Sequence, residues 1–353
     1  MSVQRLDAAE AAERLSAFGA VIDVRSPGEF AEDRLPGAVN WPVLDDDERR
    51  LVGTEYAQIS AFEAQKRGAA IVAKNIAVHI ERHVMACPKD WRPLVYCWRG
   101  GKRSGAMAWF LDQMGFRTHV IEGGYKAFRT LVREQLDALP RQLDFSVLCG
   151  RTGSGKTRLL QALHDAGAQV LDLEGLARHR GSVLGLAPGD EQPGQKAFET
   201  ALWSALRGFD AARTVYVESE SRRIGRLRVP EALLARMREH GRCLRVEMPD
   251  AGRVALLLED YDFFVRDPDY FCRQLDPLLA LRGRETVAGW QAGARAGRFG
   301  EVFLDLMRRH YDPGYDKSIR AHFAGYDAAP ALALADGSAA SLDAAVRGLL
   351  AAR

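Results

Sequence analysis

The sequence predicts an α/β protein of two domains, each built around a parallel sheet. The chain has 353 residues, which is longer than a single hydrophobic core usually supports. Short apolar runs alternate with helical patterns, as in parallel sheets covered by helices. Two of these runs pass into glycine-rich loops followed by helical sequence, at 93–112 and 144–166. We expect domains at 1–135 and 136–353, divided in the polar segment 131–145.

The composition excludes several classes of protein. The net charge is only +2, so an anionic partner must bind to local basic patches. No run of about 18 apolar residues is present, and the N-terminus lacks the apolar core of a signal peptide. We therefore expect a cytoplasmic protein without a membrane partner. The cysteines are odd in number and form no C-x-x-C pair, which argues against a disulfide framework and a zinc ribbon: Cys87, Cys97, Cys149, Cys243 and Cys272.

The first domain shows strand patterns around a helical insertion. The N-terminal residues 1–15 read as the start of an amphipathic helix. Residues 20–25 and 118–121 form short apolar runs, and 35–42 is an extended stretch with prolines. Residues 45–90 carry helical periodicity and many charges, which predicts a helical insertion.

The second domain repeats the alternation and ends in a helical tail. Residues 250–353 look mostly helical, with a break at Asp312-Pro313-Gly314. Each predicted strand precedes helix-compatible sequence, which again favours a doubly wound parallel sheet. The four candidate strands are 145–149, 168–172, 214–218 and 243–247.

One cysteine lies in a loop of cations and glycines. The short strand before it ends at Tyr96, and the loop reads Cys97-Trp98-Arg99-Gly100-Gly101-Lys102-Arg103-Ser104. Cations and backbone N–H groups lower the pKa of a thiol, and the two glycines allow successive N–H groups to converge on an anion. Arg103 could bind an oxyanion with two hydrogen bonds, and Ser104 suits the N-cap of the following helix. A nucleophilic Cys97 is therefore favoured over a buried structural thiol. The expected anion loop comprises Arg99, Gly100, Gly101, Lys102, Arg103 and Ser104.

A phosphate-binding loop begins the second domain. The motif G-x-x-x-x-G-K-[ST] follows the strand 145–149 and opens an apolar helix, which is the context that the motif requires. Lys156 supplies a charge for phosphate, and Thr157 is a candidate ligand for Mg²⁺. The strand 214–218 ends in Glu218-Ser219-Glu220, where nucleotide hydrolases usually place an aspartate. Glu218 and Glu220 are candidate acids near the metal, and the motif indicates a diphosphate-type ligand better than ATP. Its residues are Gly150, Arg151, Thr152, Gly153, Ser154, Gly155, Lys156 and Thr157.

Arginines gather after two of the strands in the second domain. They would lie at the sheet edge that carries the phosphate loop, where they could bind substrate phosphates or RNA. A solvated arginine face is the competing interpretation, and no RNA-binding module with stacking aromatics is recognisable. The candidate contacts are Arg178, Arg180, Arg222, Arg223 and Arg226.

The first domain resembles the rhodanese family. The resemblance lies in 23–30 (DVRSPGEF), 35–42 (LPGAVNWP) and 120–125 (VIEGGY), and it implies that the loop cysteine carries sulfur or selenium. Two departures matter. Arg34 stands where a histidine is often seen, and the loop from Cys97 is one residue longer than in ordinary sulfurtransferases. The length is closer to the C-x5-R loop of related phosphatases, and a roomier loop suits selenium or a phosphate ester.

Nearly the whole chain resembles the bacterial tRNA 2-selenouridine synthase family, through 97–104, 172–182, 218–225 and 310–315. The resemblance implies a rhodanese-like domain fused to a P-loop NTPase-like domain. It further implies that 2-thiouridine at the tRNA wobble position is S-geranylated by geranyl diphosphate, and that selenium from selenophosphate then gives 2-selenouridine. Cys97 would be the selenium-carrying nucleophile, and the phosphate loop with Mg²⁺ would hold the diphosphate.

Three other functions stay open from the sequence. The first is an ATP-dependent tRNA sulfurtransferase in which Cys97 delivers sulfur. The second is a phosphatase-like regulator that uses the C-x5-R loop. The third is a non-catalytic RNA-binding adaptor, which the intact thiol loop disfavours.

Overall fold

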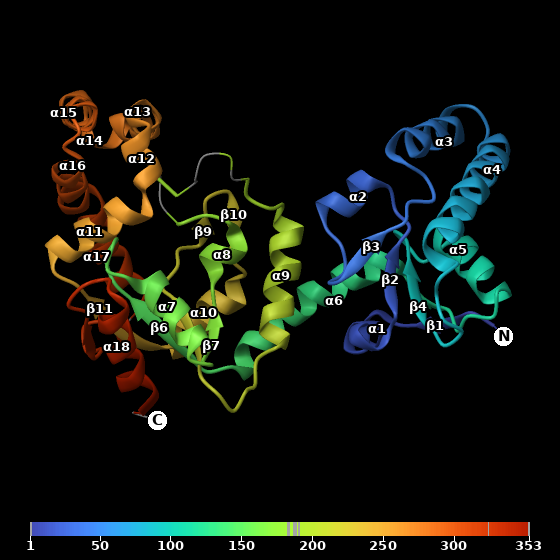
Figure 1. Ribbon diagram of the computed structural model, residues 1–353, viewed down its shortest axis with the longest axis horizontal. Coiled ribbons are helices and arrows are strands. Elements are labelled where there is room, and N and C mark those ends of the chain that lie inside the picture. Colours follow the sequence, from blue (N-terminus) through green and yellow to red (C-terminus); the bar gives the residue numbers. More distant parts are fainter. Residues whose placement is uncertain (1, 182–183, 186–188, 190, 324, 352–353) are drawn as a thin grey trace. The chain divides into compact units, whose positions relative to one another are not determined.

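The computed structural model describes residues 2–351 apart from 182–183, 186–188, 190 and 324 (Figure 1). The chain forms two compact units. The first comprises Met1–Gln135 with Glu199–Ser204, and the second comprises Leu136–Phe198 with Ala205–Arg353.

The N-terminal unit contains a parallel five-stranded sheet in the order β1-β5-β4-β2-β3. The central strand β4 is buried along its whole length, as expected for a parallel strand covered on both faces. Because β4 leads directly to Cys97, it delivers the thiol to the carboxyl edge of the sheet. The strands are β1 (Gln4–Leu6), β2 (Ala20–Asp23), β3 (Ala38–Asn40), β4 (Pro93–Tyr96) and β5 (His119–Ile121).

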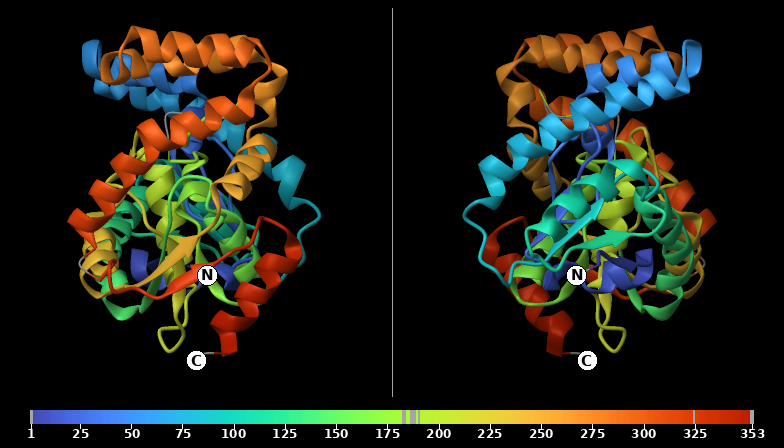
Figure 2. Two further views of the ribbon diagram at one scale, coloured as in Figure 1. Left: turned by 90° about the vertical axis from the view of Figure 1, so that its left-hand side faces the viewer. Right: turned by 90° about the vertical axis from the view of Figure 1, so that its right-hand side faces the viewer.

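The helices of this unit begin at clear capping signals. Ser26 starts α2 with a capping box and Pro27 in the first turn, and Asp45 forms a capping box with Glu48 at the start of α3. The segment predicted as a helical insertion contains the helices α3 and α4, which lie side by side in Figures 1 and 2. The helical segments are α1 (Ala8–Glu13), η1 (Leu15–Ala17), α2 (Pro27–Glu32), α3 (Asp46–Gln58), α4 (Ala61–His79), η2 (Ile80–Val84), α5 (Lys102–Gln113) and α6 (Gly124–Ala138).

The C-terminal unit is doubly wound around a second parallel sheet, in the order β12-β11-β6-β8-β7. Strand β6, which carries the phosphate loop, lies between β11 and β8. A separate antiparallel hairpin pairs β9 with β10. The strands are β6 (Phe145–Cys149), β7 (Gln169–Leu171), β8 (Val215–Glu218), β9 (Arg223–Ile224), β10 (Leu227–Arg228), β11 (Arg242–Glu247) and β12 (Ala331–Ala333).

Two apolar cores support this unit. One packs the sheet against α7 and α18, and the other joins α11 to the helices that follow it. No helix among the described residues is long and apolar enough to cross a membrane. The helical segments are η3 (Leu139–Gln142), α7 (Lys156–Asp165), α8 (Leu173–Ala177), α9 (Gln195–Arg207), α10 (Glu231–His240), α11 (Asp250–Asp260), α12 (Asp262–Arg266), α13 (Pro268–Leu275), η4 (Asp276–Leu278), α14 (Leu279–Arg282), α15 (Arg284–Arg295), α16 (Phe299–Leu306), η5 (Met307–Tyr311), α17 (Asp312–His322) and α18 (Ala339–Ala351).

The predicted fold class is confirmed, and two local expectations were wrong. The N-terminus is not wholly helical, because residues 4–6 pair with β5 as the edge strand β1. The chain is not broken at Asp312-Pro313-Gly314, where the π-helical turn η5 continues directly into α17. The tail is mostly helical and also contains the short strand β12. Pro313 lies in the first turn of α17, where its missing N–H would have no helical partner in any case.

Candidate functional site

Cys97 lies at the base of the loop between β4 and α5. Its side chain is 3% exposed. Its Sγ accepts hydrogen bonds from the backbone N–H of Gly101, at 3.3 Å, and from the Ser104 hydroxyl, at 3.1 Å. Helix α5 begins directly behind the loop, so its positive end also faces this region. These groups stabilise negative charge on the sulfur or on an anion beside it.

Two details of the anion loop differ from expectation. Gly101 is the N-cap of α5, so the prediction that Ser104 caps this helix was wrong. Ser104 lies inside the first turn, where its hydroxyl donates to Cys97 instead. Arg103 Nη1 donates to Glu29 Oε2 at 2.9 Å, and Arg49 pairs with the same carboxylate. Burial alone would raise the pKa of Glu29, but the hydrogen bond and charges of these arginines bring it below its usual value.

The remaining cations of the loop are exposed. Arg99 and Lys102 lie on the solvent side, where an incoming anion can meet them. Beneath the loop, the fully buried Arg25 forms a salt bridge with Asp23 and stacks on the Tyr125 ring, with its guanidinium 3.9 Å from the ring centroid. This scaffold is absent from the sequence-based site, although both Asp23 and Arg25 belong to the rhodanese-like DVRSPGEF segment.

Gly124 holds the back of the cysteine loop. The N–H of Tyr125 donates to the Cys97 carbonyl at 2.8 Å, so the backbone at 124–125 packs directly against the loop. Gly124 has φ = +57°, and a Cβ there would lie 2.3 Å from the Cys97 carbonyl oxygen. Only glycine combines this left-handed conformation with such a close approach.

We predict that Gly124→Ala disrupts the cysteine loop. The added Cβ must displace the backbone of Cys97 or Gly100, so the free energy of unfolding should fall by more than about 3 kcal/mol. Urea denaturation measures this loss. Gly37→Ala is the matched control, because Gly37 has φ = +73° with open space around it and should cost only about 1–2 kcal/mol. Equal losses in the two variants would contradict the predicted contact.

The phosphate loop connects β6 to α7. Gly155 is the N-cap of α7 and has φ = +84°. Lys156 Nζ donates to the carbonyl of Gly150 at 2.7 Å and to that of Arg151 at 3.4 Å. The lysine therefore lies over its own loop, at the place where loop N–H groups bind phosphate oxygens.

A buried arginine attaches the phosphate loop to two helices. Arg253, on α11, is 2% exposed and donates to the Thr152 carbonyl at 2.8 Å and 2.9 Å. The same guanidinium forms a salt bridge with Asp312 of α17 at 2.6 Å. Arg151 in turn pairs with Asp316 of α17 at 2.6 Å. Sequence reasoning missed Arg253 entirely, and it interpreted Asp312 as part of a helix break.

Three glutamates form an acidic cluster beside Lys156. Glu174, Glu218 and Glu220 each offer a carboxylate oxygen, and these oxygens lie within 4.8 Å of one another. Glu218 is 4% exposed, accepts a hydrogen bond from the Thr157 side chain, and leaves Oε1 without a hydrogen-bond partner among the described residues. The sequence predicted Glu218 and Glu220 as acids of this site but missed Glu174. Glu174 follows β7, and β8 lies between β7 and the strand β6 that leads to the phosphate loop.

Crowding of these acids changes their pKa values. Burial, followed by the charges of Glu218 and Glu220, raises the pKa of Glu174 to about 9. Burial and the Glu218 charge raise the pKa of Glu220 to about 8, and burial raises that of Glu218. A buried carboxylate with an unpartnered oxygen, next to two more carboxylates and a threonine hydroxyl, fits a hard divalent cation such as Mg²⁺.

We predict that the protein loses stability as the pH rises in the presence of EDTA. A carboxyl whose folded-state pKa is raised contributes stability below its unfolded value, near 4.5, and loses that contribution as the pH rises through the folded value. The melting temperature should therefore fall as the pH rises from about 4.5 to about 9, and MgCl₂ should reduce the fall. Scanning fluorimetry measures both effects. In the double variant Glu174→Gln/Glu220→Gln, the melting temperature should depend less on pH. An unchanged dependence of the melting temperature on pH would show that the two glutamates do not cause it.

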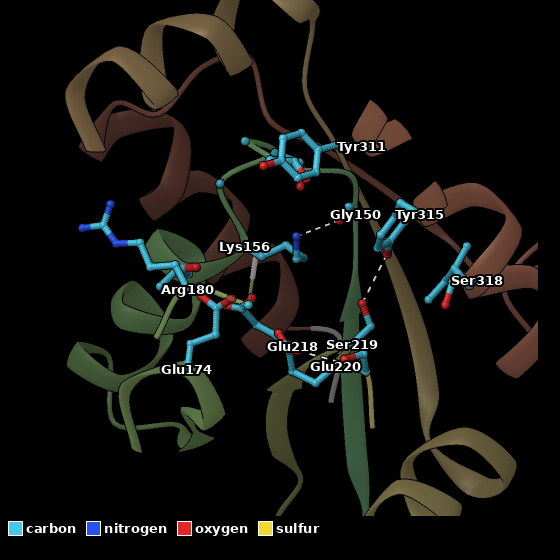
Figure 3. A pocket seen from close by; sticks show the side chains of 18 of the residues that line it. Gly150, Lys156, Glu174, Arg180, Glu218, Ser219, Glu220, Tyr311, Tyr315 and Ser318 are labelled. Carbon is cyan, nitrogen blue, oxygen red and sulfur yellow. Dashed lines mark hydrogen bonds between the residues drawn. The ribbon is translucent and has the colours of Figure 1, made fainter. Parts of the chain in front are cut away.

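The phosphate loop, the acids and an aromatic wall enclose one cavity of about 570 Å³. Figure 3 shows Tyr311 and Tyr315 on one side of Lys156 and the three glutamates on the other. The Tyr315 hydroxyl is hydrogen-bonded to Ser219 at 3.2 Å, and Lys156 Nζ lies 5.9 Å from the centre of the Tyr315 ring. Four lining residues recur at every fourth position along η5, α17 and the residue after it, which gives a mainly apolar stripe: Tyr311, Tyr315, Ile319 and Phe323.

The structure separates the predicted arginine contacts. Arg180 lines the cavity, where it lies over the Tyr261 ring at 5.0 Å and donates to the Asp260 carbonyl. The other four are exposed and do not line this cavity. Arg178 ends α8 in a left-handed conformation, Arg222 pairs with Glu231, and Arg226 binds Gln192, while Arg223 begins the β9–β10 hairpin.

Models of two protein families match the chain. The tRNA 2-selenouridine synthase AAA domain matches residues 143–274, and the rhodanese-like domain matches residues 7–131. The first match contains the phosphate loop and its three glutamates, and the second contains the Cys97 loop.

Relatives named tRNA 2-selenouridine synthase match across both units. The protein of Marinobacter nauticus is 38% identical over 334 residues, which cover 85% of this chain and 88% of the relative. That of Verminephrobacter eiseniae is 34% identical over 329 residues, covering 84% of this chain and 87% of the relative. The match with the Nitrosomonas europaea protein, 38% identical over 245 residues, covers 68% of this chain and 63% of that relative, which is less than two thirds of its length.

Among solved structures, a rhodanese-related protein of Thermoplasma volcanium is similar to part of this chain. It has 20% sequence identity and a TM-score of 0.25, and the match covers 36% of this chain and 92% of the other.

Proposed function

Because the chain belongs to the tRNA 2-selenouridine synthase family, we propose that it converts 2-thiouridine at the tRNA wobble position into 2-selenouridine. The reaction has two steps. Geranyl diphosphate first S-alkylates the thiouridine, and selenium from selenophosphate then replaces the geranylthio group. The name of the relatives, tRNA 2-selenouridine synthase, supports the overall reaction. The two sites of this chain support its division into two steps.

The observation that carries the geranyl step is the cavity at the phosphate loop. One side offers Lys156, loop N–H groups and carboxylates, and another offers the stripe of Tyr311, Tyr315, Ile319 and Phe323. A ligand with a diphosphate head and an apolar chain satisfies both sides at once. The cavity of about 570 Å³ is within the range of sites for small organic ligands. An allylic diphosphate therefore fits this site better than a free phosphate does.

The alkylation requires a stabilised leaving group. The sulfur at C2 of the uridine attacks C1 of the geranyl chain, the bond from C1 to the diphosphate oxygen breaks, and the N3 proton is released. Negative charge grows on the departing diphosphate, where Lys156 and the loop N–H groups stabilise it. Mg²⁺, held by Thr157, Glu218 and the adjoining glutamates, would supply further neutralisation of the diphosphate. The ring of Tyr315, which lines the same cavity, can stabilise a cation-like allylic carbon.

The selenium step is assigned to the Cys97 loop. Its thiol lies among hydrogen-bond donors, and Arg99 and Lys102 present positive charge to the solvent. Selenophosphate is a small anion that such a loop can bind. Cys97 acts as the nucleophile toward this donor, and Arg103, oriented by Glu29, closes the loop.

The direct test is a reconstituted reaction. tRNA with 2-thiouridine is incubated with the protein, geranyl diphosphate, selenophosphate and Mg²⁺, and the nucleosides are identified by mass spectrometry. We expect S-geranyl-thiouridine when selenophosphate is left out and 2-selenouridine in the complete mixture. Unchanged 2-thiouridine in the complete mixture would refute the proposal. Sulfur chemistry that requires ATP would favour the sulfurtransferase alternative instead.

A further inference from the structure

The Cys97 loop has the parts of a phosphoryl-transfer site. Arg103 is the sixth residue after Cys97, and Ser104 follows it directly. The Ser104 side chain is fully buried, and its hydroxyl donates to Cys97 Sγ at 3.1 Å. The Gly101 N–H donates to the same sulfur. Sulfur at the base, a helix N-terminus behind it and an arginine at the end of the loop are the groups that a tetrahedral phosphoryl anion requires.

Arg103, at the end of the loop, is held in place by a largely buried carboxylate. Its Nη1 is bound by Glu29, which is itself largely buried, with a side chain 10% exposed. A guanidinium has five N–H donors in a rigid fork, so a salt bridge at Nη1 leaves the others for phosphoryl oxygens. Arg49 pairs with the same carboxylate oxygen at 3.0 Å, which further fixes the position of Glu29. The arrangement supports a guanidinium that keeps its orientation while the ligand is exchanged.

Electron balance separates two reactions of Cys97 with selenophosphate. The selenium of this donor is at the selenide level, and its phosphorus is at the phosphate level. If the thiolate attacked selenium, the S–Se bond would hold selenium two electrons more oxidised, and phosphorus would leave as phosphite unless an oxidant took part. The proposed function supplies no oxidant. If the thiolate attacks phosphorus, the S–P bond forms, the P–Se bond breaks, and selenide leaves with the bonding pair.

Resting on the function proposed above, we propose that Cys97 takes the phosphoryl group of selenophosphate, and that selenium leaves as hydrogen selenide. The selenide adds at C2 of the S-geranylated uridine, the C2–S bond breaks, and geranylthiol departs. Water then cleaves the S–P bond of phosphocysteine, giving phosphate and the thiol. No atom changes oxidation state in this sequence. Ser104 has a defined part, because its hydroxyl donates a hydrogen bond to the sulfur as the sulfur becomes a leaving group again.

A loop that binds a phosphoryl group would account for the extra residue between Cys97 and Arg103. The sequence alone left open whether the extra residue accommodates selenium or a phosphate ester. In the phosphoryl reaction, the loop from Cys97 to Arg103 surrounds the PO₃ group in the first step, and selenium is on the side away from the sulfur. The exposed Arg99 and Lys102 would then neutralise the departing selenide.

The test uses selenophosphate labelled separately with ³²P and ⁷⁵Se on the full-length protein. The Ser104→Ala variant should retain the label best, because loss of the hydrogen bond to Sγ slows cleavage of the S–P bond, by roughly tenfold or more. After an acid quench, we expect ³²P bound to the peptide that contains Cys97, without ⁷⁵Se, and phosphate as the released product. Cys97→Ser should lose the label, whereas Cys87→Ser should keep it.

The opposite pattern overturns the proposal. If ⁷⁵Se remains on the Cys97 peptide without ³²P, or if phosphite is released, the thiolate attacks selenium. That result would leave 2-selenouridine formation intact and would refute only the phosphoryl step. If the tRNA product fails to form while ³²P still labels Cys97, the proposed function is refuted and the phosphoryl transfer stands. Selenium is recognised by its isotope pattern in the mass spectrum, although the two additions have nearly equal mass.

Discussion

Replacing Cys97 by alanine is expected to stop selenium incorporation while S-geranylation of the tRNA continues. The cavity proposed for geranyl diphosphate is built from the phosphate loop and its neighbours in the C-terminal unit, and Cys97 is not among its lining residues. The variant should therefore accumulate S-geranyl-thiouridine. Loss of a covalent nucleophile usually costs several powers of ten in rate, so 2-selenouridine formation should fall at least about 1,000-fold.

Nucleoside mass spectrometry over a time course follows both products in one sample. Cys87→Ser is the matched control, because Cys87 belongs to the same unit and its Sγ donates to the carbonyl of His83. It should match the wild type in both steps. If the Cys97 variant also lost geranylation while its melting temperature was unchanged, the two sites could not be assigned to separate steps. If it still formed 2-selenouridine, Cys97 would have no covalent role.

The parts of both sites that are contiguous in sequence were predictable. The phosphate loop can be recognised in the sequence because its motif, the preceding strand and the following helix are contiguous. The Cys97 loop can be recognised because its glycines and cations lie within eight residues. Residues that are neighbours in the sequence of such a loop remain neighbours in the folded structure. Within this loop, the role of Ser104 was not predicted. Serine is typical of an N-cap, but α5 begins one turn before Ser104, so its hydroxyl donates to the sulfur instead.

The parts that meet only through topology were not predictable. Glu174 reaches the acidic cluster because β7 pairs with β8, which pairs with β6, and the order of strands is not written in any short segment. Arg253 reaches the Thr152 carbonyl, and Tyr315 reaches Ser219, across about 100 positions of sequence. One sequence cannot rank such pairs, since many arginines and tyrosines have similar local patterns.

Two of the edge strands, β1 and β12, escaped prediction for a different reason. Each lies in a segment whose pattern favoured a helix, at 1–15 and at 250–353. Their formation depends on a neighbouring strand that offers free backbone groups, in these cases β5 and β11. The helix break predicted at Pro313 is absent because proline stops a helix in its interior but is tolerated in its first turn. The distinction requires knowing where α17 begins.

Replacing Lys156 by alanine is expected to slow the proposed geranyl step strongly and to leave the proposed selenium step competent. Lys156 Nζ binds the carbonyls of Gly150 and Arg151, so a diphosphate would exchange these two acceptors for its own oxygens. Removing the charge leaves the departing diphosphate without its cation, which should slow geranylation roughly 100- to 1,000-fold. Supplying tRNA that is already S-geranylated should restore 2-selenouridine formation to the wild-type rate.

The rescue by geranylated tRNA separates a chemical role of Lys156 from a structural one. A misfolded variant would fail with either tRNA, whereas a variant that lacks only the diphosphate contact recovers with the modified one. Lys74→Ala, which removes an exposed lysine in the N-terminal unit, is the control for loss of one positive charge and should behave as the wild type.

Titration calorimetry measures the affinity of the protein for geranyl diphosphate and for inorganic pyrophosphate. Both ligands depend on Lys156, but only geranyl diphosphate uses the stripe of Tyr311, Tyr315, Ile319 and Phe323, so its advantage over pyrophosphate should survive the substitution. Wild-type geranylation by Lys156→Ala, together with lost ATP turnover, would instead assign the phosphate loop to a nucleotide.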